Sequence, residues 1–151
     1  IILREKTNII ISYIITTLLL VGTHDLMAVN NILGEPLALC GRDPVTGYFR
    51  DGYCNTTDED HGTHVVCAVV TEKFLSYTKS QGNDLSTPNV LYRFPGLKPG
   101  DRWCLCALRW REAFEAGVAP DIDPMSTHEK ALKYIPLETL LAFRYDRTEQ
   151  Q

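Results

Sequence analysis

Cysteine and histidine are the residues of this sequence whose types and spacing could support chemistry. Cys104 and Cys106 stand two positions apart in an apolar run, and His64 stands three positions before Cys67. Residues two apart in a strand face the same side, so the sulfurs of Cys104-x-Cys106 can turn toward one centre. Thiolate and imidazole groups are ligands of Zn²⁺, although structural zinc sites usually have two short-spaced ligand pairs and this chain has one. The sequence therefore offers His64, Cys67, Cys104 and Cys106 as candidate metal ligands, with zinc as the candidate cofactor.

The same cysteines allow two further hypotheses. In a thiol-dependent enzyme, Cys67, Cys104 or Cys106 would be the reactive group, and such thiols need a nearby positive charge or a helix N-terminus. In an interaction protein, all three would be inert and buried, since free cysteine is among the most buried residue types. The chain has five cysteines without dense regular spacing, which does not resemble a secreted disulfide framework, so we expect reduced thiols.

The stretch DHGTHVVC, residues 60–67, contains the string HGTH that subtilisin-like serine proteases use around their catalytic histidine. A serine triad also needs an orienting acid and a nucleophilic serine, each in its own structural setting. The other two signatures of that family, of the Asp-Thr-Gly and Gly-Thr-Ser-Met-Ala types, are absent from this sequence, and the chain is too short for that fold. We therefore exclude a subtilisin-like protease.

Polar side chains near turn signals are the candidate binding residues. Residues 83–88, NDLSTP, are dense in polar groups and predict Asx and Ser/Thr turns or, alternatively, a substrate-binding loop. The pairs 50–51 and 101–102 could pin turns as ion pairs or bind an anion. The acidic residues 58–60 lack the ligand spacing of a calcium loop and are expected in a solvated loop. The candidates for binding are Arg50, Asp51, Asn83, Asp84 and Arg102.

Composition bounds the class of protein. With 151 residues, 44% hydrophobic and 23% charged, the chain has the size and composition of one globular domain. A net charge of −4 with scattered basic residues argues against nucleic-acid binding. The other partners stay unknown, and no stable membrane insertion is expected of the globular part.

The first 26 residues differ from the rest. Their apolar run, residues 9–21, is shorter than the about 20 residues that span a bilayer. Residues 1–26 are therefore expected to be a non-globular upstream extension or a leader, and residues 27–151 a single domain. If translation starts at Met27, we expect a cytoplasmic protein; a genuine leader would make it secreted or anchored.

The hydrophobic pattern predicts an α+β domain. Residues 37–56 contain turn signals and predict a hairpin with a loop. Residues 65–70 predict a buried strand, after which Thr71 can cap a helix that ends near Gly82. The strand-then-helix pattern recurs at 102–108 with 109–116, and at 130–135 with a helix starting at Pro136. We thus expect one small domain, with an N-terminal hairpin followed by three strand–helix units on one sheet.

Four segments of the sequence resemble a known family. They are residues 31–37 (NILGEPL), 43–52 (DPVTGYFRDG), 82–88 (GNDLSTP) and 94–107 (FPGLKPGDRWCLCA). This resemblance, over roughly residues 32–145, is to domain of unknown function 2237, a mainly bacterial family to which no activity is attached. Its members usually have a Cys-Cys pair where this chain has Tyr53-Cys54, and the pattern Asp, aliphatic, Gly, small, His where this chain has residues 60–64. The resemblance implies that His64 is the family position and that His61 is incidental.

Overall fold

The computed structural model describes residues 28–145 and has an α+β architecture, as the sequence predicts. A short antiparallel sheet carries helices that are joined by long ordered loops. The elements in chain order are β1 (His64–Val69), α2 (Glu72–Ser80), β2 (Arg102–Cys106), α3 (Ala107–Glu115), β3 (Asp121–Ile122), two 3₁₀ turns (Pro124–Ser126 and Glu129–Lys133) and α4 (Leu137–Ala142).

The sheet has the strand order β2-β1-β3, so β1 lies in its centre. Five of the residues from Val65 to Val70 are buried, as a central strand of β-branched and small side chains requires. Cys67 pairs with Cys104 across the two longer strands, and an irregularity between His64 and Val66 brings His64 opposite Cys106. A bulge of this kind re-aims a side chain at the end of a strand.

The helices begin where the local sequence predicts. The hydroxyl of Thr71 accepts the backbone N–H of Phe74 at 3.1 Å and so caps α2, while Phe74, Leu75 and Thr78 of this helix are buried. Helix α3 follows β2 without a loop and turns Trp110 into the core, where its indole donates to the carbonyl of Pro120 at 3.0 Å. Pro136 precedes α4, as expected of a residue with a preset backbone angle.

Two predicted elements, the strand at 130–135 and the hairpin at 37–56, differ in the structure. Residues 129–133 form a 3₁₀ turn instead of a strand, because Nδ1 of His128 accepts the backbone N–H of Lys130 and turns the chain. The third strand is Asp121–Ile122, two residues that carry no alternating pattern. The expected hairpin at 37–56 is an ordered loop in which a single isolated bridge joins Arg42 and Val45.

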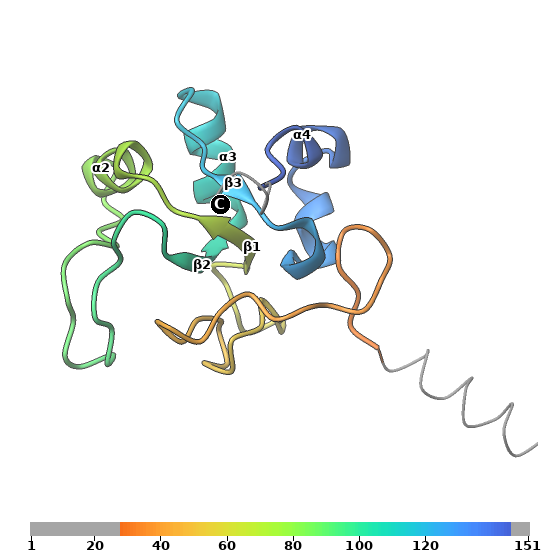
Figure 1. Ribbon diagram of the computed structural model, residues 1–151, viewed down its shortest axis with the longest axis horizontal. Coiled ribbons are helices and arrows are strands. Elements are labelled where there is room, and N and C mark those ends of the chain that lie inside the picture. Colours follow the sequence, from red (N-terminus) through yellow and green to blue (C-terminus); the bar gives the residue numbers. More distant parts are fainter. Residues whose placement is uncertain (1–27, 146–151) are drawn as a thin grey trace, which may run out of the picture.

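Figure 1 shows how the loops lie around the sheet. In this view the helices lie above the strands, and the segment from residue 28 to about 60 (orange to yellow) runs below them. The loop between α2 and β2 (green) extends to one side. Residues 1–26, which the sequence marks as an extension or leader, lie outside the described part. Within residues 28–145, no helix has the length and apolar character needed to cross a bilayer.

Candidate functional site

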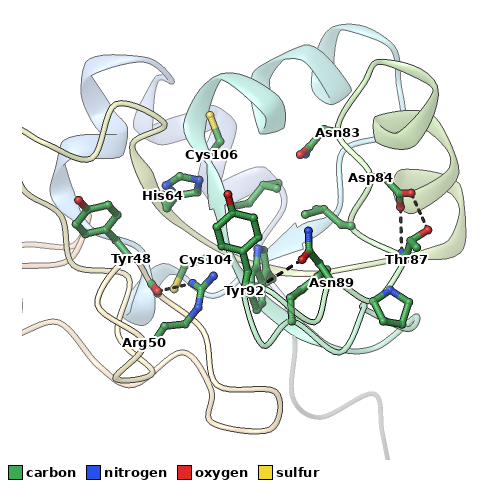
Figure 2. A pocket seen from close by; sticks show the side chains of 16 residues that line it. Tyr48, Arg50, His64, Asn83, Asp84, Thr87, Asn89, Tyr92, Cys104 and Cys106 are labelled. Carbon is green, nitrogen blue, oxygen red and sulfur yellow. Dashed lines mark hydrogen bonds between the residues drawn. The ribbon is translucent and has the colours of Figure 1, made fainter.

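A cavity of about 760 Å³ opens where the two long loops meet strand β2 and the start of β1 (Figure 2). One wall comes from the N-terminal loop, through Gly47, Tyr48 and Arg50. The opposite wall comes from the loop after α2, and the strand residues between them form the floor. The cavity thus collects chemistry-bearing side chains from distant parts of the sequence, namely His64, Asn83, Asp84, Thr87, Asn89, Tyr92, Cys104 and Cys106.

His64 is held at this cavity by the buried Asp60. Oδ1 of Asp60 lies 2.6 Å from Nδ1 of the imidazole, and Oδ2 accepts the backbone N–H of His64 at 3.0 Å. Only 1% of the Asp60 side chain is exposed, against 41% of the His64 side chain. The imidazole is therefore anchored through Nδ1, and the residue that it belongs to lines the cavity.

The loop before β1 is shaped to place this pair. The backbone of Thr63 has a φ of 50°, in the left-handed region, which turns the chain between the acid and the base. Gly62 lies directly against the imidazole, and a Cβ at this position would collide with the ring atoms of His64. In the spacing Asp60-x-Gly62-x-His64, Asp60 supplies the acid, Gly62 leaves room for the imidazole ring, and His64 supplies that ring.

The electrostatics of Asp60 favour its charged form. Burial raises the pKa of this carboxyl, but the hydrogen bonds from the backbone and imidazole of His64, their charge interaction and the hydroxyl of Thr56 outweigh burial. The pKa of Asp60 therefore lies below its usual value of 3.8. An ionised Asp60 can accept a proton from Nδ1 of His64, which fixes the tautomer of a neutral imidazole with its proton on Nδ1.

Cys106 is the free cysteine of the chain, whose five cysteines all fall within the described residues. It is the residue that precedes α3, and its side chain makes no capping hydrogen bond to that helix. The thiol is partly exposed and lines the cavity, on the same side as His64 in Figure 2. Cys106 therefore combines three properties: a free thiol, access to solvent and a helix N-terminus beside it.

Aromatic rings and an arginine form the neighbouring wall. The guanidinium of Arg50 lies 5.2 Å from the ring centroid of Trp103 and donates to the carbonyl of Gly47 at 2.7 Å. Phe94 packs on Trp103 with ring centroids 5.2 Å apart. A cation stacked on an aromatic floor can bind ligands that carry both an apolar and an anionic part.

The loop from Asn83 to Thr87 forms the far wall and is preorganised by its own side chains. Oδ1 of Asp84 accepts the backbone N–H groups of Ser86 and Thr87, and Oδ2 accepts the hydroxyl of Thr87 at 2.7 Å. The hydrogen bond from Thr87 is the main reason that the pKa of Asp84 is lowered. The predicted Asx turn is present, and the same segment lines the cavity; its role as a substrate-binding loop stays a prediction.

The expectation of reduced thiols is wrong in this structure. Cys40 is bonded to Cys67 and Cys54 to Cys104, and these two disulfides lie together in a buried cluster. The pairing links the N-terminal loop to the sheet, a relationship between distant segments that spacing along the chain does not reveal. Cys67 and Cys104 are therefore not available as reactive thiols in the oxidised protein.

The predicted metal ligands are consequently not assembled as a set. His64, Cys104 and Cys106 line the cavity, whereas Cys67 does not, and both Cys67 and Cys104 are bonded in the disulfide cluster. Among residues 28–145, the potential ligand atoms that do lie together are the sulfurs of Cys40, Cys54 and Cys104, which are within 4.8 Å of one another.

Of the candidate binding residues, Arg50, Asn83 and Asp84 line the cavity, and the other two do not. Asp51 accepts the backbone N–H of Tyr53 in a local turn. Arg102 donates to the carbonyl of Cys40 and to Asp123, both at 2.6 Å, and its guanidinium lies 3.5 Å from the sulfur of Cys67. Neither pair of adjacent charges, 50–51 or 101–102, is the ion pair that the sequence suggested.

Asp60 is the residue of this site that sequence reasoning missed, since the acidic run was expected to be a solvated loop. The available signal was the four-residue separation of Asp60 and His64 around a glycine. Trp103 was expected in the core, which is confirmed, but it also lines the cavity.

The fold and the site define a small α+β protein in which a single cavity holds a free thiol and an Asp–His pair. A family model described as "Uncharacterized protein conserved in bacteria (DUF2237)" matches residues 30–144, and the chain belongs to this family. This membership confirms the resemblance read from the sequence. A comparison with curated proteins finds no match.

Proposed function

We propose that this protein is a thiol-dependent enzyme, in which Cys106 is the nucleophile, His64 the general base and Asp60 the residue that orients His64. The observation that carries the proposal is the 2.6 Å contact between Asp60 and His64, with His64 paired opposite the free Cys106 on adjacent strands. A nucleophile, a base and a third group that positions the base are the arrangement that activates a thiol.

The position of Cys106 supports the role of nucleophile. Cys106 directly precedes α3, which is nine residues long, so its sulfur lies at the end of the helix that carries a partial positive charge. The other four cysteines are buried and bonded in pairs, so Cys67 and Cys104 are buried as disulfides and not as the free thiols that the inert-cysteine hypothesis described. Of the three cysteines that the thiol-enzyme hypothesis named, Cys106 therefore remains as the reactive thiol.

The reaction class that these groups support is acyl transfer from an ester or thioester. His64 takes the proton of the Cys106 thiol, and the sulfur forms a bond with the acyl carbon. The bond to the leaving alcohol or thiol then breaks, and the imidazolium returns the proton to that group. Water, activated by the same imidazole, releases the acid and restores the thiol.

The cavity walls support a substrate with an apolar acyl part and an anionic or polar end. The aromatic surface of Trp103 and Phe94 suits the apolar part, and the guanidinium of Arg50 suits a negative group beside it. A cavity of about 760 Å³ falls within the usual range of about 300–1,000 Å³ for small-molecule sites.

The experiment is a comparison of variants in two assays. Iodoacetamide should label the oxidised full chain once, at Cys106, and His64→Gln should lower the labelling rate at least about 10-fold at pH 7. With p-nitrophenyl acetate, the wild type should show a burst of one nitrophenol per chain, because the acyl-enzyme forms faster than it is hydrolysed.

His61→Gln is the matched control, because this exposed imidazole lies in the same loop and outside the cavity. It should leave both assays unchanged, and Cys106→Ser should abolish both. Equal labelling rates in wild type and His64→Gln, together with no burst, would overturn the proposal.

The redox state of the four paired cysteines depends on the compartment in which the protein is located. Disulfides persist in oxidising compartments and are rare in the cytosol. If translation starts at Met27 and the protein is cytoplasmic, the four paired cysteines would be reduced there. Alkylation of intact cells followed by mass spectrometry of the protein, which counts the blocked thiols, tests this directly.

A further inference from the structure

The four paired cysteines form a buried cluster beside the cavity, which one of them, Cys104, also lines. Cys40, Cys54, Cys67 and Cys104 are all at most 3% exposed and pack on one another as a unit distinct from the main core. They come from the N-terminal loop and from the facing residues of β1 and β2, where Cys67 and Cys104 are register partners. Two elements of the sheet and two points on one loop therefore converge on a single buried centre.

Sulfurs from different disulfides are close in this cluster. Those of Cys40, Cys54 and Cys104 lie within 4.8 Å of one another, and that of Cys67 is bonded to Cys40. In a tetrahedral Zn²⁺ site with Zn–S bonds of about 2.3 Å, neighbouring sulfurs are about 3.8 Å apart. The sulfur of Cys40 is thus within about 1 Å of this spacing from the sulfurs of Cys54 and Cys104, whereas the two sulfurs of each disulfide must move apart once the bond between them is broken.

We infer that the reduced protein binds one Zn²⁺ through Cys40, Cys54, Cys67 and Cys104, so that this cluster alternates between two disulfides and a zinc–thiolate centre. A dithiol is the reductant: two equivalents supply four electrons and four protons, both S–S bonds break, and four thiols form. Zn²⁺ then displaces the four protons as four Zn–S bonds form. Two equivalents of a small-molecule disulfide are the oxidant: thiol–disulfide exchange passes four electrons to them, they leave as four thiols with four protons from water, both protein S–S bonds form again, and Zn²⁺ is released.

Arg102 supports this inference through its charge. Zinc with four thiolates has a net charge of minus two, which is costly in a buried site unless positive groups lie nearby. The guanidinium of Arg102 lies 3.5 Å from the sulfur of Cys67 and is held there by its bonds to the Cys40 carbonyl and Asp123. Outer groups of this kind orient and tune metal ligands.

This site differs from the set that sequence reasoning proposed. It shares Cys67 and Cys104 with that set, replaces His64 and Cys106 by Cys40 and Cys54, and leaves the proposed catalytic thiol free. It also makes a four-cysteine centre without a C-x-x-C motif, because the ligands come from a loop and two paired strands.

The test is a metal titration of the full chain in both redox states. The chain is reduced with excess dithiol, freed from reductant under anaerobic conditions and titrated with Co²⁺, whose absorption reports tetrahedral thiolate ligation. We expect one Co²⁺ per reduced chain, displacement by Zn²⁺, and uptake below about one tenth of an equivalent by the oxidised chain. Zinc should also raise the melting temperature of the reduced chain.

Two variants distinguish this site from other thiol binding. Cys54→Ser should weaken Co²⁺ binding more than about 100-fold, whereas Cys106→Ser should bind like the wild type. If the reduced wild type takes up no metal, or if Cys54→Ser binds as tightly as the wild type, the inference is overturned. Loss of binding in Cys106→Ser would likewise overturn it, by placing the metal in the cavity.

Discussion

Asp60 and His64 are joined twice: Oδ1 of the carboxylate lies 2.6 Å from the imidazole Nδ1, and Oδ2 accepts the His64 backbone N–H at 3.0 Å. One buried carboxylate thus fixes both the main chain and the side chain of one residue. The hydrogen bonds lower the pKa of Asp60 by more than burial raises it, so this carboxylate is ionised. It anchors His64, which lines the cavity.

Replacing Asp60 by asparagine should destabilise the fold in a pH-dependent way. At pH 7 we expect Asp60→Asn to lower the free energy of unfolding by about 2 kcal/mol, since buried hydrogen bonds to a charged group are lost. The folded pKa of Asp60 is lowered, so its stabilisation is present above the usual value of 3.8 and is lost as the pH falls through the folded pKa. The difference between the two proteins should therefore shrink below about pH 4.

Urea denaturation of both proteins at pH 7 and pH 3 measures this effect. Asp58→Asn is the matched control, because this exposed acid is in the same loop and should change the unfolding free energy by less than about 0.5 kcal/mol. An equal loss for Asp60→Asn at both pH values would show that the carboxylate charge plays no part.

The separation of acid and base by a glycine leads to a second prediction. Gly62→Ala places a Cβ against the imidazole and should push the ring of His64 off Asp60. Labelling of Cys106 by iodoacetamide should then slow at least about 10-fold. Gly41→Ala is the control, because a Cβ at that glycine makes an ordinary 3.6 Å contact. Equal labelling rates in the two variants would contradict the role assigned to Gly62.

Local sequence signals were sufficient for much of the fold. The run of β-branched residues from 65 to 70 predicted the central strand, and Thr71 predicted the start of α2 through a hydroxyl that does cap the helix. These predictions hold because the periodicity and the capping residue act within a few positions. The third strand, Asp121–Ile122, has no such signal, since its pairing with β1 is decided by tertiary contacts.

The site was harder to predict from the sequence, because it too depends on tertiary contacts between distant positions. Cys104-x-Cys106 suggested two sulfurs at one centre, whereas Cys104 is bonded to Cys54, fifty positions away, and Cys106 ends the strand beside a helix. Disulfide pairing is a long-range fact that spacing leaves open. The sequence predicts a solvated acid at Asp60, because no local signal shows that a positive φ at Thr63 folds the chain back over this residue.

Thr46 gives a third prediction, on the open edge of the sheet. Its buried hydroxyl accepts the backbone N–H of Cys104 at 2.8 Å, which ties the N-terminal loop to β2. Thr46→Val keeps the shape but leaves this N–H without its acceptor, so the free energy of unfolding should fall by about 1–3 kcal/mol. Thr46→Ser retains the hydroxyl and should cost less than about 1 kcal/mol. Urea denaturation at pH 7 measures both, and equal losses would contradict the hydrogen-bond explanation.

The two disulfides should contribute unequally to stability. In the chain-entropy model a disulfide stabilises by restricting the unfolded chain, more so for a longer closed loop. The pair Cys54–Cys104 spans 50 positions and the pair Cys40–Cys67 spans 27. Removing either pair as a double alanine variant should lower the free energy of unfolding by about 3–4 kcal/mol, with about 0.5 kcal/mol more for Cys54–Cys104.

The Cys54–Cys104 disulfide should also have a local effect on the cavity, because Cys104 lies on the cavity floor and Cys54 ends the loop that carries Tyr48 and Arg50. Hydrogen exchange of residues 46–54 should accelerate in that double variant more than in Cys40→Ala/Cys67→Ala, which also removes two buried sulfurs. The comparison between the two variants cancels the loss of sulfur volume, so it isolates loop anchoring. If both variants exchange these amides at the same rate, the Cys54–Cys104 bond does not hold the cavity wall, and the hydrogen bond from Cys104 to Thr46 would be its main tie to the sheet.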